Sequence, residues 1–220
     1  MLVASLNVAA VHAQAPSGRD QLDKFAQGLD SLTAGFEQRV VGRDGNVEDQ
    51  SEGKLWLSQP HFIRWEYGGD FPELVVADGQ QIWIYDEVLE QVTVKPQSEF
   101  AADSPLSLLT DIDKLDSQFE VREGGDVDGM FLLELRPKQT ETEFERVLLG
   151  LRDDELRMMT MEDAFGLRTE IRFSGLERNA TISSDLFTFT PPEGVDVIGG
   201  AAVYPLKHPE SEPERNLENR

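Results

Sequence analysis

Short runs of alternating apolar and polar residues fill the chain from Phe36 to about residue 190. β-branched and aromatic residues are frequent in these runs, a pattern that is typical of strands with one buried face. The runs predict strands near residues 36–41, 53–58, 61–67, 73–77, 80–86, 90–95, 118–123, 130–136, 144–151, 155–162, 167–175 and 186–190. Asp-Gly dipeptides, which favour hairpin turns, fall between such runs at Asp44-Gly45, Asp78-Gly79 and Asp128-Gly129. The pattern therefore predicts a mainly β fold, built on an antiparallel sheet that curls or closes.

Three segments depart from this alternation. Before the first strand, apolar residues recur at helical spacing, which predicts one amphipathic helix of about three turns that is capped by Ser17 or Asp20. Its apolar stripe consists of Leu22, Phe25, Ala26, Leu29 and Leu32. Further along, Ser104-Pro105 predicts the start of a short helix, and residues 182–186 are a second place for a brief helical turn. With these helices, the fold class is α+β in a broad sense.

The two ends of the chain differ from the patterned region. Residues 2–11 are mostly apolar and are followed by small residues at the positions that a signal peptidase reads, which predicts an export signal over residues 1–13. No Lys or Arg precedes Arg19, so the basic region that usually begins an export signal is missing. A truncated or misassigned start is therefore an open alternative. A single domain is expected over residues 14–205, followed by a polar, disordered tail at 206–220.

Composition excludes several kinds of chemistry. The 42 acidic and 20 basic residues give a formal charge of −22, which disfavours nucleic-acid binding. A solvated acidic surface is the favoured interpretation of this charge, and a docking surface for basic partners is the alternative. The chain has no cysteine, and His61 is the one histidine within the patterned region, so a thiolate site or a serine–histidine triad is not expected. No catalytic motif, metal site or cofactor site is predicted.

Aromatic strands are the remaining candidate for function. In the strand near residues 61–67, Ile63, Trp65 and Tyr67 share one face, and Trp83 shares a face of its own strand with Tyr85. Large rings on one face suit either an ordinary core or a site for an apolar ligand. Alternation alone favours the core.

Motifs across most of the chain resemble the periplasmic outer-membrane lipoprotein carrier family. The matching segments are Phe36-x-Gln38, Gly53-x-Leu55-Trp56, Pro60 followed by Trp65, Asp78-Gly79-x-x-Ile82-Trp83-x-Tyr85-Asp86, Glu90-Gln91 and Phe187-Thr188-Phe189-Thr190-Pro191-Pro192-x-Gly194-Val195. The resemblance runs from about Leu22 to Val197. It implies an unclosed antiparallel β-barrel with short helices that act as a lid over an apolar cavity.

The resemblance also implies a function and a set of partners. A member of this family is a non-enzymatic, monomeric periplasmic carrier that accepts lipoproteins from an inner-membrane ATP-driven (ABC-type) releasing complex. It passes them to an outer-membrane receptor. A lipid or lipoprotein sensor, or a carrier of another amphiphile, is the alternative on the same fold. A periplasmic hydrolase is disfavoured, because no nucleophile–base pair is visible.

By the same resemblance, candidate site residues can be named. The acyl-chain cavity is expected to be lined by Ile63, Trp65 and Trp83, with Leu106 and Leu109 on the lid. Members of the family commonly carry an arginine that bonds the lid immediately before the motif proline. Gln59 takes that place here, so the expected latch is a neutral hydrogen bond, which is weaker than a charged one.

Overall fold

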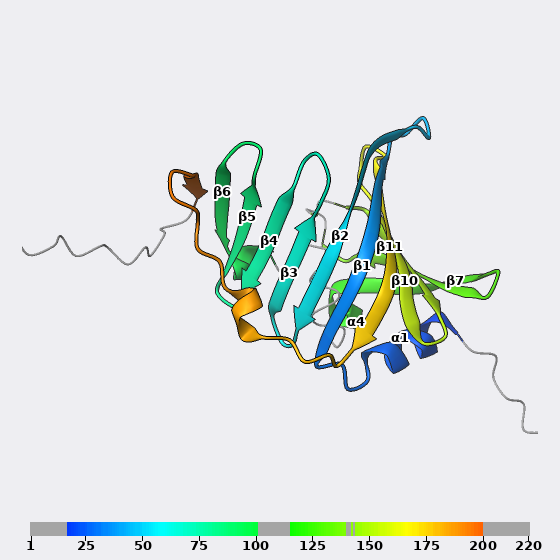
Figure 1. The fold of residues 1–220 in the computed structure, drawn as a ribbon. Helices are drawn as coiled ribbons and strands as arrows, with labels where there is room; N and C mark the ends of the chain where they lie inside the picture. The colour runs from blue at the N-terminus through cyan, green and yellow to red at the C-terminus, as the bar shows by residue number, and fades with distance from the viewer. Residues whose placement is uncertain (1–16, 101–114, 140–141, 143, 200–220) are drawn as a thin grey trace, which may run out of the picture.

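The computed structural model describes residues 17–100, 115–139, 142 and 144–199. Within these ranges the chain forms one sheet of 12 strands, in the spatial order β12-β6-β5-β4-β3-β2-β1-β11-β10-β9-β8-β7. All neighbours are antiparallel except β12, which lies parallel to β6. The sheet is strongly curved (Figure 1), and its edge strands β12 and β7 do not pair. The predicted unclosed, mainly β fold is therefore confirmed.

The strands follow the predicted order closely. They are β1 (Ser31–Val41), β2 (Val47–Ser58), β3 (Phe62–Tyr67), β4 (Glu73–Asp78), β5 (Gln81–Asp86), β6 (Gln91–Pro96), β7 (Phe119–Val127), β8 (Met130–Pro137), β9 (Arg146–Arg152), β10 (Glu155–Glu162), β11 (Arg168–Arg178) and β12 (Asp196–Gly199). Each of the first eleven predicted strands overlaps one of β1 to β11. All three Asp-Gly dipeptides form hairpin turns, and Gly45, Gly79 and Gly129 have positive φ angles, which glycine adopts without strain.

The N-terminal helix α1 (Gly18–Ala26) is shorter than the apolar spacing predicted. Ser17 caps it in a capping box, in which the Ser17 hydroxyl accepts from the Asp20 N–H at 3.1 Å and the Asp20 carboxylate accepts from the Ser17 N–H at 3.2 Å. The helix ends before Gly28, whose φ of +64° breaks the helical path. The last residues of the predicted stripe, Leu29 and Leu32, stay buried but lie in the following loop and in β1.

The helix defines the inner face of the sheet. α1 packs against β7, β8, β9 and β10, and its Leu22 and Phe25 join the same buried cluster as Ile63 and Trp65. Short helices α2 (Gln97–Phe100) and α4 (Leu115–Gln118) follow β6 and precede β7. We call the face that bears this cluster the inner face and the opposite one the outer face.

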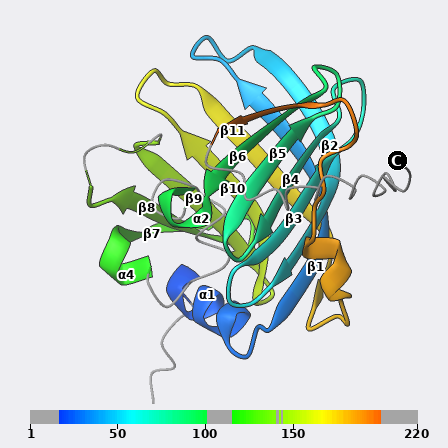
Figure 2. The same ribbon diagram turned by 90° about the vertical axis from the view of Figure 1, so that its left-hand side faces the viewer.

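A C-terminal segment covers part of the outer face. The predicted strand at 186–190 is wrong, because the 3-10 turn η2 (Ser184–Phe187) occupies its start. The predicted helical turn near 182–186 is confirmed, and Ser183 caps it by accepting from the Asp185 N–H at 3.4 Å. The chain then crosses the outside of the sheet to β12, on the side opposite α1 and α4 (Figure 2). We call residues 184–199 the strap.

Some predictions concern residues outside the described ranges. They are the export signal at 1–13, the lid residues Leu106 and Leu109, and the tail at 206–220. Among the helices of the described ranges, none has the length and apolar character needed to cross a membrane.

Candidate functional site

Strand register places two of the predicted cavity residues side by side on the inner face. Across β3 and β4, Ile63 is paired with Ala77 and Trp65 with Val75. Since directly opposed residues of an antiparallel pair point to the same face, these four side chains form one apolar surface. All four are buried. The structure therefore brings Ile63 and Trp65 together, as the alternation predicted.

An aromatic cluster surrounds Trp65 on this face. Its ring centroid lies 4.8 Å from that of Phe36, 6.1 Å from that of Tyr67 and 6.4 Å from that of Phe173, in tilted or edge-to-face arrangements. Gly53 makes this packing possible, because a Cβ at that position would lie 2.8 Å from the Phe36 ring and 1.8 Å from the Glu66 carbonyl oxygen. The absent side chain in β2 lets rings from β1 and β3 meet.

The Trp65 indole carries a polar group into this cluster. Trp65 is 1% exposed, and its Nε1–H has no hydrogen-bond partner in the described part of the chain. Most buried polar atoms in folded proteins are paired, so a lone buried donor requires an explanation.

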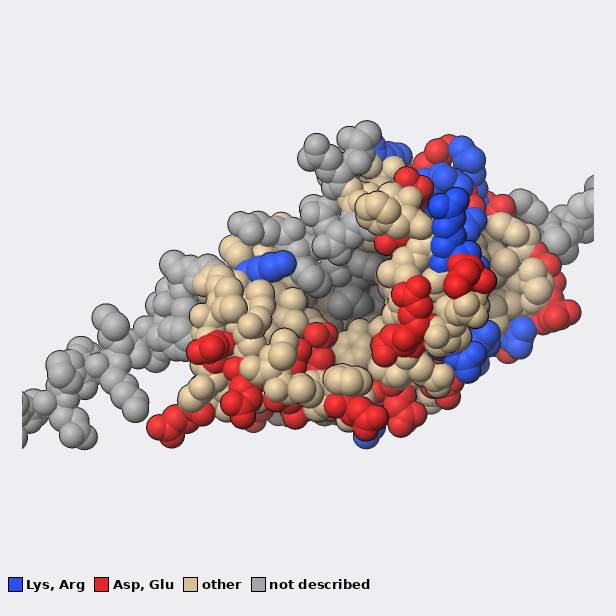
Figure 3. Space-filling view, turned by 90° about the horizontal axis from the view of Figure 1, so that it is seen from above, with Lys and Arg blue, Asp and Glu red and all other residues tan. Residues whose placement is uncertain are grey.

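A cavity of about 700 Å³ opens next to the cluster, at the end of the sheet where β3 turns into β4. It is lined by Gln38, Asp49, Gln50, Ser51, Glu52, Tyr67, Gly68, Gly69, Asp70, Phe71 and Glu73. Viewed from that end, the molecule is hollow and acidic side chains gather around the hollow (Figure 3). Phe71, which is 76% exposed, adds an aromatic ring to the rim. Tyr67 belongs to both the cavity and the cluster, so the cavity leads toward Trp65.

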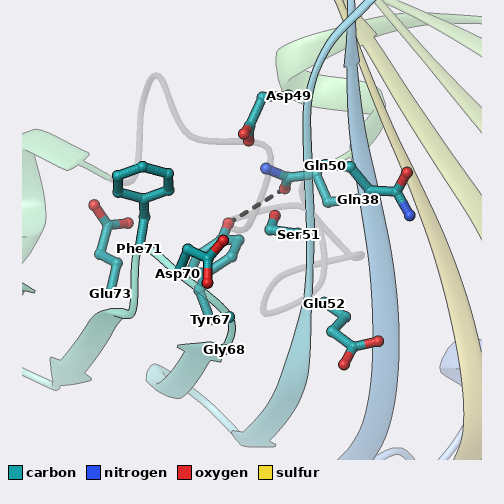
Figure 4. A pocket seen from close by; sticks show the side chains of 11 residues that line it. Gln38, Asp49, Gln50, Ser51, Glu52, Tyr67, Gly68, Asp70, Phe71 and Glu73 are labelled. Atoms are coloured by element: carbon teal, nitrogen blue, oxygen red, sulfur yellow. Dashed lines mark hydrogen bonds between the residues drawn. The ribbon is translucent and has the colours of Figure 1, made fainter.

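Polar contacts hold the wall of this cavity. The Tyr67 hydroxyl donates to Gln38 Oε1 at 3.3 Å (Figure 4). Burial raises the pKa of Tyr67, and the nearby Glu73 carboxylate raises it further. Burial also raises the pKa of Glu73, with a second contribution from Asp86, which is its cross-strand partner on β5. The wall therefore combines a protonated phenol with a carboxylate that gains a proton more readily than usual.

Trp83 lies on the opposite face of the sheet from Ile63 and Trp65. It is paired with Val76 on β4 and Val94 on β6, which are both buried on the outer face. Its Nε1–H donates to Asp78 Oδ2 at 2.9 Å, and its ring lies 5.8 Å from Phe189 of the strap. Because the β3–β4–β5 register fixes these positions, Trp83 does not share a surface with Trp65.

The Asp78 carboxylate connects the Asp-Gly turn to the Trp83 ring. One oxygen of the Asp78 carboxylate accepts from the backbone N–H groups of Gln80 and Gln81, at 2.9 and 2.7 Å, while the other accepts from Trp83. The motif therefore builds a turn and anchors a ring on the outer face.

The predicted latch residue Gln59 lies in the turn between β2 and β3. Its backbone N–H donates to the Asp30 carbonyl at 2.8 Å, and none of the hydrogen bonds within the described ranges involves its side chain. An arginine of the neighbouring strand makes a different contact. Arg64 faces outward, pairs with Glu66 at 2.6 Å and donates to the Leu186 carbonyl of η2 at 3.2 Å.

Several residues of the site were not among the sequence candidates. Phe36, Gln38, Tyr67 and Phe173 form the cluster and cavity wall with Trp65. Two features of the sequence could have indicated them: the Phe36-x-Gln38 motif, and the two-residue spacing that places Tyr67 on the same face as Trp65. Among the described residues, no group of three or more His, Asp or Glu side chains is arranged to hold a metal ion.

Comparison with known proteins identifies relatives of this architecture. Residues 27–190 match the family model described as "Outer membrane lipoprotein carrier protein LolA". The chain is 43% identical over 185 residues to the outer-membrane lipoprotein carrier protein of Xanthomonas campestris pv. campestris, which covers 83% of this chain and 88% of that protein. It is 41% identical over 180 residues to the protein of the same name in Dechloromonas aromatica, covering 82% and 86%. A solved structure of an uncharacterized conserved protein from Thermus thermophilus shares the fold, with a TM-score of 0.52, 16% identity and coverage of 82% and 95%.

Proposed function

We propose that this chain, which belongs to the LolA family of outer membrane lipoprotein carrier proteins, binds the acyl chains of lipoproteins and carries them between membranes. The observation that carries the proposal is the apolar inner face around Ile63 and Trp65, which is continuous with a cavity of about 700 Å³. The cavity has a polar, acidic rim and meets the apolar cluster at Tyr67, so a lipid chain that passes the rim reaches an apolar surface.

The energetics of acyl burial fit a direct handover. Each buried methylene contributes about 0.8 kcal/mol, so one long acyl chain contributes on the order of 10 kcal/mol. A chain held this strongly leaves too slowly into water to be useful. The cargo therefore passes directly to a receptor whose site binds it more strongly, and the carrier itself needs no catalytic group.

The family relationship supports the following partners and place of action. The cargo comes from an inner-membrane ABC-type lipoprotein-releasing complex and goes to an outer-membrane lipoprotein receptor. The carrier works in the periplasm as a monomer. Within the site, Ile63 and Trp65 contact the acyl chains, Leu106 and Leu109 belong to the lid, and Gln59 contributes to its latch.

Native mass spectrometry of the protein purified from a periplasmic extract tests this function. A 1:1 complex with a triacylated lipoprotein is expected. Free phospholipid or an empty protein would instead favour a sensor, or a carrier of another amphiphile, on the same fold.

A matched pair of variants locates the site. Trp65→Gln should abolish uptake of lipoprotein from inner-membrane preparations, because it places an amide in the apolar wall. Trp83→Gln, on the outer face of the same strands, should leave uptake in place. Circular dichroism checks that both variants fold. Equal uptake by the two folded variants would contradict the assignment of the inner face.

A further inference from the structure

The indole N–H of Trp65 is buried and has no acceptor among the described residues, which points to a partner that arrives from outside the protein. Leaving a buried donor without an acceptor costs about 1–3 kcal/mol. A phenylalanine would fill most of the same space without this cost. Trp83 shows the ordinary arrangement in the same sheet, because Asp78 accepts from its Nε1–H at 2.9 Å. The Trp65 donor is therefore explained if an acceptor arrives with a ligand.

The surroundings of Trp65 restrict the chemistry of that ligand. Phe36 and Phe173 place ring carbons next to it, and Leu55 and Val75 flank it on the neighbouring strands β2 and β4. The ligand that reaches this cluster must be mostly apolar. It must also carry a hydrogen-bond acceptor, since the indole can only donate.

An acyl chain meets both requirements. Its methylenes suit the apolar wall, and its carbonyl oxygen is an acceptor at the head end of the chain. The cavity that leads from the rim past Tyr67 approaches the Trp65 ring, whose centroid lies 6.1 Å from that of Tyr67. A chain that enters tail first by this route brings its carbonyl to Trp65 only after its methylenes have passed beyond that ring.

We propose that Trp65 Nε1–H donates to an ester carbonyl of the bound lipid and makes the site selective for ester-linked acyl chains over ether-linked alkyl chains. This inference rests on the proposed function, since it names the part of the cargo that the same site recognises. The bond also sets how deeply the chains enter, because the carbonyl fixes the position of the head end. Trp65 is then a specificity-determining residue as well as an apolar contact.

The test compares two synthetic lipopeptides that bear an N-terminal cysteine with a blocked amine. One carries a glyceryl group with two ester-linked palmitoyl chains, and the other carries two ether-linked hexadecyl chains. Affinities are measured by titration calorimetry for the full chain, for Trp65→Phe and for Trp83→Phe. We expect the wild-type protein and Trp83→Phe to bind the ester probe on the order of tenfold more tightly than the ether probe. Trp65→Phe should bind the two probes within about twofold of each other.

Nuclear magnetic resonance can detect the proposed hydrogen bond directly in the wild-type protein, without relying on a variant that folds. The chain has three tryptophans, so its indole N–H signals can be separated and assigned. The Trp65 signal should move downfield with the ester probe and not with the ether probe. Tight, equal binding of both probes with no such shift would overturn the inference and leave the carrier function intact. Failure of the wild-type protein to bind either probe would count against the proposed function, and the inference would fall with it.

Discussion

The two faces of strands β3 to β5 differ in how they accommodate a tryptophan. Each face carries a tryptophan among apolar neighbours, Trp65 on the inner face and Trp83 on the outer face. On the outer face the chain supplies everything that the ring needs. Phe189 of the strap packs on Trp83, and Asp78 accepts its indole N–H. The ring contact and the hydrogen bond of Trp83 are therefore both supplied by the chain itself.

The inner face remains incomplete in comparison. Trp65 is more deeply buried than Trp83, yet its donor has no acceptor in the described part of the chain. The strap covers the part of the outer face that bears Trp83, whereas a cavity of about 700 Å³ lies beside the inner cluster. A satisfied aromatic surface indicates packing, and an unsatisfied one beside a cavity indicates binding. The presence of aromatic rings on a face does not by itself show whether that face packs against the chain or binds a ligand.

Removal of the strap's main anchor should have the largest effect on stability. Phe187 is 5% exposed and its ring lies 5.7 Å from that of Phe62. Phe187→Ala should lower the free energy of unfolding by about 3–5 kcal/mol, because it leaves a cavity beneath η2. Denaturation by urea measures this change. Lipid binding by the folded variant should persist, because the strap lies on the outer face.

Phe165 provides the control for this change. It is 83% exposed, so Phe165→Ala should alter the free energy of unfolding by no more than about 0.5 kcal/mol. An equally small loss for Phe187→Ala would show that the strap does not stabilise the sheet, and the contrast between the two faces would disappear.

The sequence predicted the sheet well because strand signals are local. Alternation, β-branched residues and Asp-Gly turns each act within a few residues, so the strands β1 to β11 could be found. Apolar spacing alone predicts that Leu29 and Leu32 belong to the helix, because the spacing continues through Gly28, where the backbone leaves the helical path. The strap could not be read from alternation, since its path is set by contacts between residues 184–199 and strands that are distant in the sequence.

The site was predicted in part for the same reason. The parity of Ile63 and Trp65 within one strand is a local property, and the structure places them as expected. The face of Trp83 depends on how β5 is registered against β4 and β3, which no local pattern reveals. The family resemblance led to the expectation that Trp83 lines the acyl-chain cavity, whereas the strand register places it on the outer face.

Conservative replacement of each tryptophan should give a smaller and more direct comparison. Trp83→Phe removes a donor from the Asp78 carboxylate and should cost about 1.5–3 kcal/mol of unfolding free energy. Trp65→Phe removes a buried N–H that has no partner in the described part of the chain. The free energy gained by removing this unpaired donor offsets the packing lost with the smaller ring. We expect Trp65→Phe to lie within about 1 kcal/mol of the wild-type protein. Chemical denaturation in the absence of lipid measures both values, and a larger loss for Trp65→Phe would contradict the unpaired state of its N–H.

Substitution of Glu73, at the rim of the inner face, should have the smallest effect on the free energy of unfolding. This effect should depend on pH. Burial first and Asp86 second raise the pKa of Glu73 above its ordinary value of 4.5. A carboxyl whose folded-state pKa is raised favours folding while it is protonated, and this contribution is lost as the pH rises through the folded-state pKa. Glu73→Gln removes the ionisation, so at neutral pH the variant should be more stable than the wild-type protein by roughly a few tenths of a kcal/mol, since the group is partly solvated.

The advantage of Glu73→Gln should shrink as the pH falls toward 4.5 and below, where wild-type Glu73 is protonated in both states. Unfolding free energies measured at several pH values between about 4 and 8 follow this difference. Asp86→Asn separates the two causes: because burial is the larger one, this variant should recover less than half of the gain. A constant difference between Glu73→Gln and the wild-type protein across the whole range would show that Glu73 is as well solvated as a surface carboxylate. The inner rim would then be an open surface, and the contrast with the strap-covered part of the outer face would rest on Trp65 alone.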